Sequence, residues 1–116
     1  MRRGDMFWVD LDPARGSEAT KSRPAVIVSN DGVNTAVHRH GRGVVTVVPV
    51  TSNVERVYPF QVLIEAADHS GLRNDSKAQA EQVRAVDVSR IGRRITTLSP
   101  NAMNKLDAAL RLHLAL

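Results

Sequence analysis

The sequence predicts a mainly β (α+β) fold: a small antiparallel barrel or strongly bent sheet with one C-terminal helix. Short runs of branched and apolar residues, separated by polar turn residues, recur over the first 98 residues. After Ser99-Pro100 the apolar spacing changes from that of strands to that of a helix. About five or six short strands followed by one helix are typical of this architecture.

The first strand is expected from Met6 to Leu11, which are rich in aromatic and branched residues and precede Asp12-Pro13. The polar segment from Pro13 to Ser22 is long for a hairpin loop, which is typical of a functional or disordered segment. A second strand is expected from Pro24 to Ser29, because proline cannot donate a ladder hydrogen bond and suits the start of a strand. Arg23 then lies where the loop meets the sheet.

The clearest strand is Gly43 to Val50, and the small polar residues Thr51-Ser52-Asn53 end it abruptly. Before it, residues 30–42 are polar and predict only one helical turn, near Val33–Val37. A further strand is expected at Phe60–Ile64.

The run from Lys77 to Val86 is expected to be a strand, although its alternation is poor. Gln82 shares a face with the small residues Ala78 and Ala80, which indicates a bulge, a barrel corner or a side chain directed at a site. A last short strand is expected at Arg94–Leu98.

The C-terminal helix has a clear start, because Ser99 is a good N-cap residue and Pro100 suits the first helical position. One apolar face of this helix is expected to pack on the sheet. Its residues recur at helical spacing: Met103, Leu106, Leu110 and Leu114.

Composition limits the class of protein. A chain of 116 residues is enough for one domain and too short for two, so residues 1–116 are expected to form a single domain. The absence of cysteine excludes a disulfide scaffold, thiolate chemistry and cysteine-based zinc sites. No apolar run reaches membrane-spanning length and the first residues lack a signal-peptide pattern, so a cytoplasmic protein without membrane association is expected.

The charge favours a polyanionic partner. The formal net charge is +4, from 16 Lys and Arg against 12 Asp and Glu. Most of the basic residues are arginine, which binds phosphate in a bidentate manner better than lysine does. Nucleic acid and an acidic protein both fit this charge, and a mildly basic surface without a specific partner remains an alternative.

No motif for metal or nucleophilic catalysis is present. His38 and His40 are two residues apart without a carboxylate at ligand spacing, while His69 and His113 are isolated. A nucleophile elbow and a glycine-rich phosphate loop are both missing from the sequence. We therefore expect no metal site and no cofactor.

Polar residues at strand ends are the remaining candidates. The start of one antiparallel strand lies beside the end of its neighbour, so Arg23 and Thr51 can share one rim of the sheet. A guanidinium beside hydroxyl groups suits a phosphate whose charge rises in a transition state. A rim that only satisfies the ends of the sheet is the alternative, and the residue pattern leaves both open.

Five stretches in order resemble the MazF/PemK toxins of bacterial type II toxin–antitoxin pairs. The resemblance runs from about Arg3 to the final helix, and the joint order and spacing of the stretches is specific. The stretches are Arg3-Gly4-Asp5 with Trp8 to Pro13, Gly16-Ser17-Glu18, Lys21 with Arg23 to Ser29, Val48 to Ser52 with Tyr58-Pro59-Phe60, and Glu81 to Arg84.

This resemblance implies a homodimer of small SH3-like barrels of the CcdB/PemK type. It also implies a metal-independent, sequence-selective endoribonuclease that cleaves single-stranded messenger, ribosomal or transfer RNA. In this chemistry the ribose 2′-hydroxyl attacks the adjacent phosphorus and leaves a 2′,3′-cyclic phosphate and a 5′-hydroxyl. A cognate antitoxin, expected to be an acidic and partly disordered segment, would neutralise the toxin.

The resemblance assigns catalytic roles to Arg23 and Thr51, and it implies that the loop from Pro13 to Ser22 gates RNA. Arginine is not deprotonated in proteins, so Arg23 is expected to act as a cation on the phosphorane, with Thr51 as a hydrogen-bond donor. His38 and His40 are interpreted as solvated loop histidines rather than as the general base. The residues expected to bind RNA are Ser17, Glu18, Lys21, Ser52, Gln82 and Arg84.

Two other functions remain as alternatives. A CcdB-like gyrase poison would use the same barrel, but those relatives depend on a C-terminal aromatic residue and this chain ends Leu112-His113-Leu114-Ala115-Leu116. A non-catalytic barrel that only binds nucleic acid is the second alternative.

Overall fold

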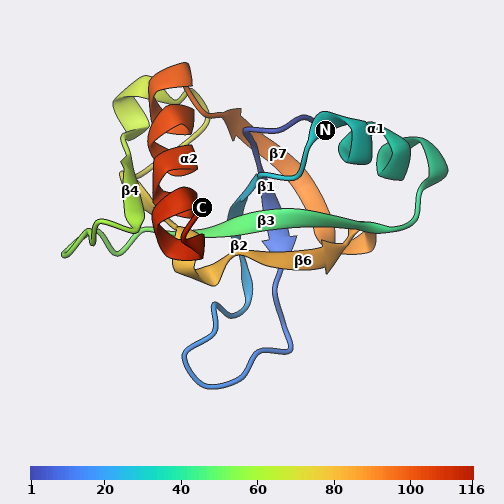
Figure 1. Cartoon of the computed structure of the whole chain (residues 1–116), viewed down its shortest axis with the longest axis horizontal. Helices are drawn as coiled ribbons and strands as arrows, with labels where there is room; N and C mark the ends of the chain where they lie inside the picture. Colours follow the sequence, from blue (N-terminus) through green and yellow to red (C-terminus); the bar gives the residue numbers. More distant parts are fainter.

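The structure is a computed structural model that describes residues 1–116. Seven strands and two α-helices follow one another along the chain, with three short 3₁₀ turns (Figure 1). Their bounds are β1 (Asp5–Asp10), β2 (Ser22–Ile27), α1 (Asp31–His40), β3 (Val44–Thr51), β4 (Gln61–Ile64), η1 (Ala66–Asp68), β5 (Ser76–Gln79), η2 (Ala80–Gln82), β6 (Arg84–Asp87), η3 (Val88–Arg90), β7 (Ile91–Thr97) and α2 (Pro100–Leu114).

All strand pairs are antiparallel, and the strands lie in the order β4-β5-β3-β2-β1-β7. Strand β3 also pairs with β6, so it has three partners along its length. Figure 1 shows β3 running across the molecule while α2 crosses the sheet on one side. The predicted fold class, a mainly antiparallel sheet with a C-terminal helix, is confirmed.

The core lies on both faces of the sheet. Val48 and Val50 belong to a cluster covered by α2, with Leu106 fully buried at its centre. Val45 and Val47 belong to a second cluster on the opposite face. Because both faces of β3 are buried, its sequence is a continuous apolar run rather than an alternating one, and this made it the clearest predicted strand.

The start of β2 differs from the prediction. The strand begins at Ser22, not at Pro24, so Arg23 lies inside it and pairs with Val9 of β1. Pairing with β3 starts only at Ala25. No β3 residue therefore stands opposite Pro24, and the proline is tolerated two residues into the strand.

The segment before β3 is a helix of ten residues, so the prediction of a single helical turn was wrong. The Asn30 side chain accepts a hydrogen bond from the Val33 N–H, and Gly41 ends the helix in a left-handed conformation with φ 67°. The buried face of α1 contains Asn34, whose amide bonds both the hydroxyl and the carbonyl of Ser29. A polar residue in the buried face hides the apolar periodicity that would have indicated a helix.

The predicted strand from Lys77 to Val86 is split into β5 and β6 by the turn η2, which confirms the irregularity but not the single strand. Val50 pairs with Ala78 and Val47 pairs with Arg84. Three steps along β3 thus correspond to six along the partner, so three extra residues are inserted there, as in an enlarged bulge.

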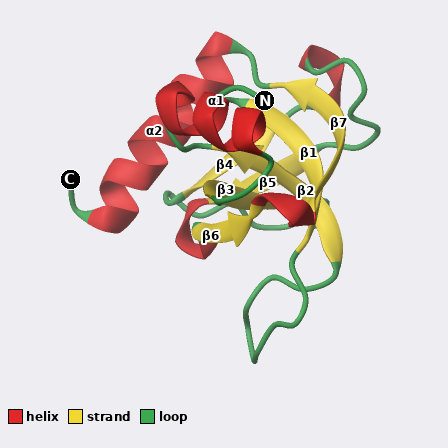
Figure 2. Ribbon diagram, turned by 90° about the vertical axis from the view of Figure 1, so that its right-hand side faces the viewer, coloured by secondary structure: helices red, strands yellow, loops and turns green.

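The C-terminal helix packs as predicted through Leu106, with Met103 and Leu110 half-buried against the same core. Leu114 does not, because 48% of it is exposed. Figure 2 shows the last turns of α2 extending past the strands, so the end of the helix has no sheet to cover. Neither helix is both long enough and apolar enough to cross a membrane.

Candidate active site

A cavity of about 850 Å³ opens where β2 and β3 separate. The register pairs Ala25 with Pro49, and its continuation would place Arg23 opposite Thr51. The pairing of β2 with β3 ends at Ala25 and Pro49, before it reaches these two residues, and on the other edge of β3 Val50 and Thr51 pair with β5. Both Arg23 and Thr51 line the cavity left between the two strands, so the prediction that they share one rim is confirmed.

Arg23 is half-buried, and its Nε donates a hydrogen bond to the Thr20 carbonyl at 2.8 Å. That bond fixes one edge of the guanidinium. The two terminal nitrogens have no acceptor in the protein and no carboxylate partner. Arg23 therefore presents a positioned pair of donors, which is the geometry that binds two oxygens of one phosphate.

Thr51 is the last residue of β3, and its side-chain Oγ1 accepts a hydrogen bond from the Asn53 N–H at 3.3 Å. Because the oxygen is used as an acceptor, the hydroxyl proton remains available for a ligand in the cavity. Ser52 is exposed and lines the same cavity. The structure thus brings together three of the predicted site residues: Arg23, Thr51 and Ser52.

The lining of this cavity is basic. Arg73, Arg93 and Arg94 line it together with Arg23, and no aspartate or glutamate does. Arg94 lies 3.7 Å from Asp5, whereas Arg73 and Arg93 have no carboxylate within ion-pair distance. Uncompensated arginines around one cavity create a local positive potential that attracts a polyanion.

Trp8 lies on the rim of the same cavity and is 39% exposed. An exposed tryptophan beside arginines offers a face on which a nucleic-acid base can stack. Four residues that line the cavity were not predicted from the sequence as site candidates: Trp8, Arg73, Arg93 and Arg94. The sequence does contain signals for a basic and aromatic surface, in the Met6–Leu11 run and in the pair Arg93-Arg94. Only the register of β1 with β7 places these residues at the cavity.

The other predicted RNA-binding residues form a second group at the loop between β1 and β2. Gln82 accepts a hydrogen bond from the Ala19 N–H and donates one to the Ser17 carbonyl, both at 3.1 Å. Arg84 donates to the Leu11 carbonyl at 3.2 Å. Gln82 and Arg84 therefore hold the two sides of the loop, and neither lines the cavity.

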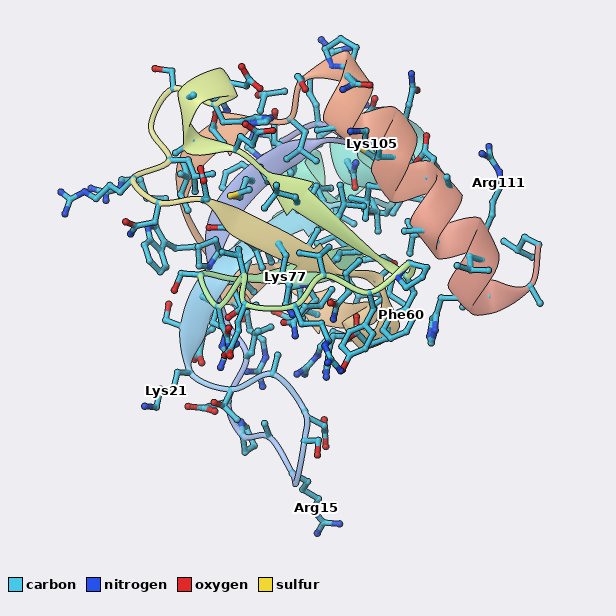
Figure 3. All side chains as sticks on the ribbon, turned by 90° about the vertical axis from the view of Figure 1, so that its left-hand side faces the viewer. Arg15, Lys21, Phe60, Lys77, Lys105 and Arg111 are labelled. Atoms are coloured by element: carbon cyan, nitrogen blue, oxygen red, sulfur yellow. The ribbon has the colours of Figure 1, made fainter.

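Within the loop, Glu18 accepts a hydrogen bond from the Arg15 N–H at 3.1 Å, and the Lys21 N–H donates to Asp12 at 2.9 Å. The side chains of Glu18 and Lys21 are exposed. Figure 3 shows Arg15 at the tip of the loop and Lys21 near its base. Ala19 is buried in the core, so the loop has one apolar anchor that was not predicted from the sequence. The expectation that this loop gates RNA stays a prediction.

The two histidines considered as bases lie on α1, exposed, and not in a loop as predicted. Neither lines the cavity. His69 is buried, and its two ring nitrogens contact the Glu65 carbonyl at 2.7 Å and the Ser99 N–H at 3.1 Å. No three histidine, aspartate or glutamate side chains are grouped as a metal-ligand set.

The chain is a small protein with an antiparallel sheet and a C-terminal helix, and Arg23 and Thr51 lie at one basic cavity. The positive charge and free donors of this cavity are those that a phosphate group requires. Residues 2–114 match the family described as PemK-like, MazF-like toxin of type II toxin–antitoxin system. The chain belongs to this family, which confirms the resemblance drawn from its sequence motifs.

Two relatives match over the whole chain. "Endoribonuclease MazF9" of Mycobacterium tuberculosis (strain ATCC 25618 / H37Rv) is 58% identical over 116 residues, covering 100% of this chain and 98% of the relative. "Endoribonuclease EndoA" of Bacillus subtilis (strain 168) is 34% identical over 121 residues, covering 100% of this chain and 96% of the relative.

Solved structures share the fold. An endoribonuclease in complex with its cognate antitoxin from a mycobacterial species is 25% identical with a TM-score of 0.75, covering 100% of this chain and 96% of that one. MazF from Deinococcus radiodurans, at 24% identity, has a TM-score of 0.81 over 100% of this chain and 97% of that one, and it supports the fold alone.

Proposed function

We propose that this chain is the toxin of a type II toxin–antitoxin system and acts as a metal-independent, sequence-selective endoribonuclease on single-stranded RNA. The observation that carries the proposal is the pair formed by Arg23 and Thr51 at one basic cavity, in a chain that belongs to the MazF-like family. Its relatives named as endoribonucleases support the same activity.

In the proposed reaction the ribose 2′-hydroxyl attacks the adjacent phosphorus, and the bond from phosphorus to the 5′-oxygen breaks. A 2′,3′-cyclic phosphate and a 5′-hydroxyl result. The free guanidinium nitrogens of Arg23 bind the phosphorane oxygens as their negative charge increases, and the Thr51 hydroxyl donates to one of them. A guanidinium and a hydroxyl group are both poor proton acceptors, so both residues act by stabilising charge rather than by removing the proton.

Substrate binding is proposed to extend along two surfaces. The arginines around the cavity hold neighbouring phosphates. The loop between β1 and β2 is proposed to gate the access of RNA to the cavity and to contribute to RNA binding, together with the residues that anchor it. The residues proposed to bind RNA are Ser17, Glu18, Lys21, Ser52, Gln82 and Arg84. Residues 1–116 act as a single toxin domain.

We propose further that the protein works in the cytoplasm as a homodimer and is neutralised by a cognate antitoxin. A mycobacterial neighbour in the same fold was solved with its antitoxin. The net charge of +4 and the carboxylate-free cavity favour an acidic, partly disordered antitoxin segment that competes with RNA for the same surface.

The test uses purified protein and end-labelled single-stranded RNA in excess EDTA. Cleavage is expected to persist and to leave 2′,3′-cyclic phosphate and 5′-hydroxyl ends. A substrate with one 2′-deoxyribose immediately 5′ to the cut should resist cleavage. Cleavage of that substrate would exclude the proposed mechanism, and RNA binding without any cleavage would indicate the non-catalytic barrel instead.

A further inference from the structure

Lys77 extends the candidate active site across a third strand. It pairs with Thr51 in the β3–β5 register, on the opposite side of β3 from β2. Residues paired across antiparallel strands project toward the same face, with Cβ atoms about 4.5–5.5 Å apart. Arg23 lies on β2, on the other side of β3, and lines the first cavity together with Thr51. The three residues therefore form one row across β2, β3 and β5.

Lys77 is unusual because it is a buried cation without a carboxylate partner. Only 8% of the residue is exposed. Its Nζ donates to the Arg56 carbonyl at 2.6 Å and lies 6.0 Å from the centre of the Tyr58 ring. Neither of the two ion pairs in the protein includes it. Two of its three N–H donors therefore have no acceptor in the protein, and burying such a charge without a counter-charge is costly.

Lys77 lines a second cavity, of about 470 Å³. Thr51 and Ser52 line the first cavity and Asn53 lines the second. Arg56 and Tyr58 are also in the lining, with the guanidinium of Arg56 bonded to the Tyr58 hydroxyl at 3.2 Å. Glu55 is the only acidic residue there, and it makes no ion pair with either cation.

We propose that Lys77, together with Arg56, binds the RNA phosphate adjacent to the one cleaved at Arg23 and Thr51. The row of residues gives the geometry, because consecutive phosphates of one strand can then occupy the two cavities in turn. A phosphate oxygen supplies the acceptors and the negative charge that the buried ammonium lacks. The Tyr58 ring holds the ammonium from one side, so the site is formed before RNA arrives. This inference rests on the proposed RNA substrate.

The experiment measures binding of an uncleavable single-stranded oligonucleotide with 2′-deoxyribose at the cut. Each phosphate near the cut is replaced in turn by a neutral methylphosphonate. In the wild-type protein, neutralising the adjacent phosphate should raise Kd about tenfold, as expected for a charged hydrogen bond. In Lys77→Met, which keeps a long apolar side chain, the same replacement should have no further effect, because the pair is already broken.

Lys105→Met is the matched control, since it removes the same charge from an exposed position on α2. Figure 3 shows Lys105 on the helix, away from Lys77. It should keep the full sensitivity to the adjacent phosphate. Lys77→Met should also lower the salt dependence of binding, by a slope of about 0.7 in log Kd against log salt.

Arg56→Gln provides a second variant that leaves the buried lysine and its backbone acceptor in place. It should also reduce sensitivity at the adjacent phosphate, and it carries the test if Lys77→Met does not fold, as judged by circular dichroism. Equal sensitivity of wild-type protein and folded variants at every phosphate would overturn the inference and leave Lys77 as a structural support for residues 53–58. Failure of the wild-type protein to cleave all-RNA substrate would refute the proposed function instead, so the two failures are distinguishable.

Discussion

Replacing Arg23 with alanine tests the centre of the proposed site. In the structure the guanidinium is fixed by one bond to the Thr20 carbonyl, and its two terminal nitrogens are free to bind the phosphorane. Loss of one such transition-state stabiliser reduces the rate on the order of 10²–10³-fold, or about 2.7–4 kcal/mol. Single-turnover cleavage of a labelled RNA with excess enzyme measures this chemical step directly, separate from product release.

The same substitution removes the hydrogen bond to Thr20, which contributes about 1 kcal/mol to stability. The midpoint of thermal unfolding should therefore fall by only about 4 °C. Fold and oligomeric state should persist by circular dichroism and size-exclusion chromatography. A large loss of activity with a small loss of stability is the expected combination.

Two companion variants separate charge from geometry. Arg23→Lys keeps the charge but not the planar fork, so it should restore only part of the lost rate. Arg39→Ala removes the same charge from an exposed position on α1 and should cleave at the wild-type rate. If Arg23→Ala cleaves at nearly the wild-type rate, or if Arg39→Ala loses as much activity, the assignment of Arg23 is wrong.

Two further predictions concern the loop and the pH dependence of stability. Gln82→Met removes the two hydrogen bonds that hold Ala19 and Ser17, which together contribute about 1–3 kcal/mol. The amide hydrogen of Ala19 should therefore exchange with solvent about 5–150-fold faster. Unchanged exchange would show that Gln82 does not anchor the loop. Hydrogen bonds from the Arg3 N–H and from the Asn34 side chain lower the pKa of Asp31. The ionised Asp31 therefore stabilises the folded state at pH values above the pKa of an unfolded aspartate, and this contribution is lost as the pH falls below about 4. Asp31→Asn should therefore flatten the decline of stability in acid, measured by denaturant unfolding across that range.

Those elements that depend on local signals were predictable from the sequence. The Ser99-Pro100 start of α2 is encoded by two adjacent residues, and Ser99 does accept a hydrogen bond from the Ala102 N–H at 3.1 Å. The strand β3 was clear because both of its faces are buried. In contrast, α1 was underestimated because its stability depends on caps at Asn30 and Gly41 and on a buried asparagine, none of which produces an apolar period.

For the candidate site, the proximity of Arg23 and Thr51 could be predicted from the sequence, whereas the position of Lys77 could not. Antiparallel pairing of two strands that are close in sequence is enough to bring Arg23 near Thr51. The place of Lys77 depends on how β5 aligns with β3, and 25 residues separate Thr51 from Lys77 along the chain. No local pattern contains that register, so the third member of the row could not be found from the sequence.

The three-residue insertion at η2 affects two parts of the site: the row of Arg23, Thr51 and Lys77, and the loop between β1 and β2. Because three extra residues are placed between β5 and β6, β3 pairs with β5 at its end and with β6 nearer its start. The first pairing puts Lys77 beside Thr51. The insertion itself includes Gln82, whose amide reaches the loop rather than the core. The polar residue that disturbed the predicted strand is therefore an anchor for the loop, and shortening η2 by these three residues should disrupt the loop contacts and the Lys77–Thr51 pairing together. A shortened variant that keeps wild-type RNA affinity and loop protection would separate the two and refute this connection.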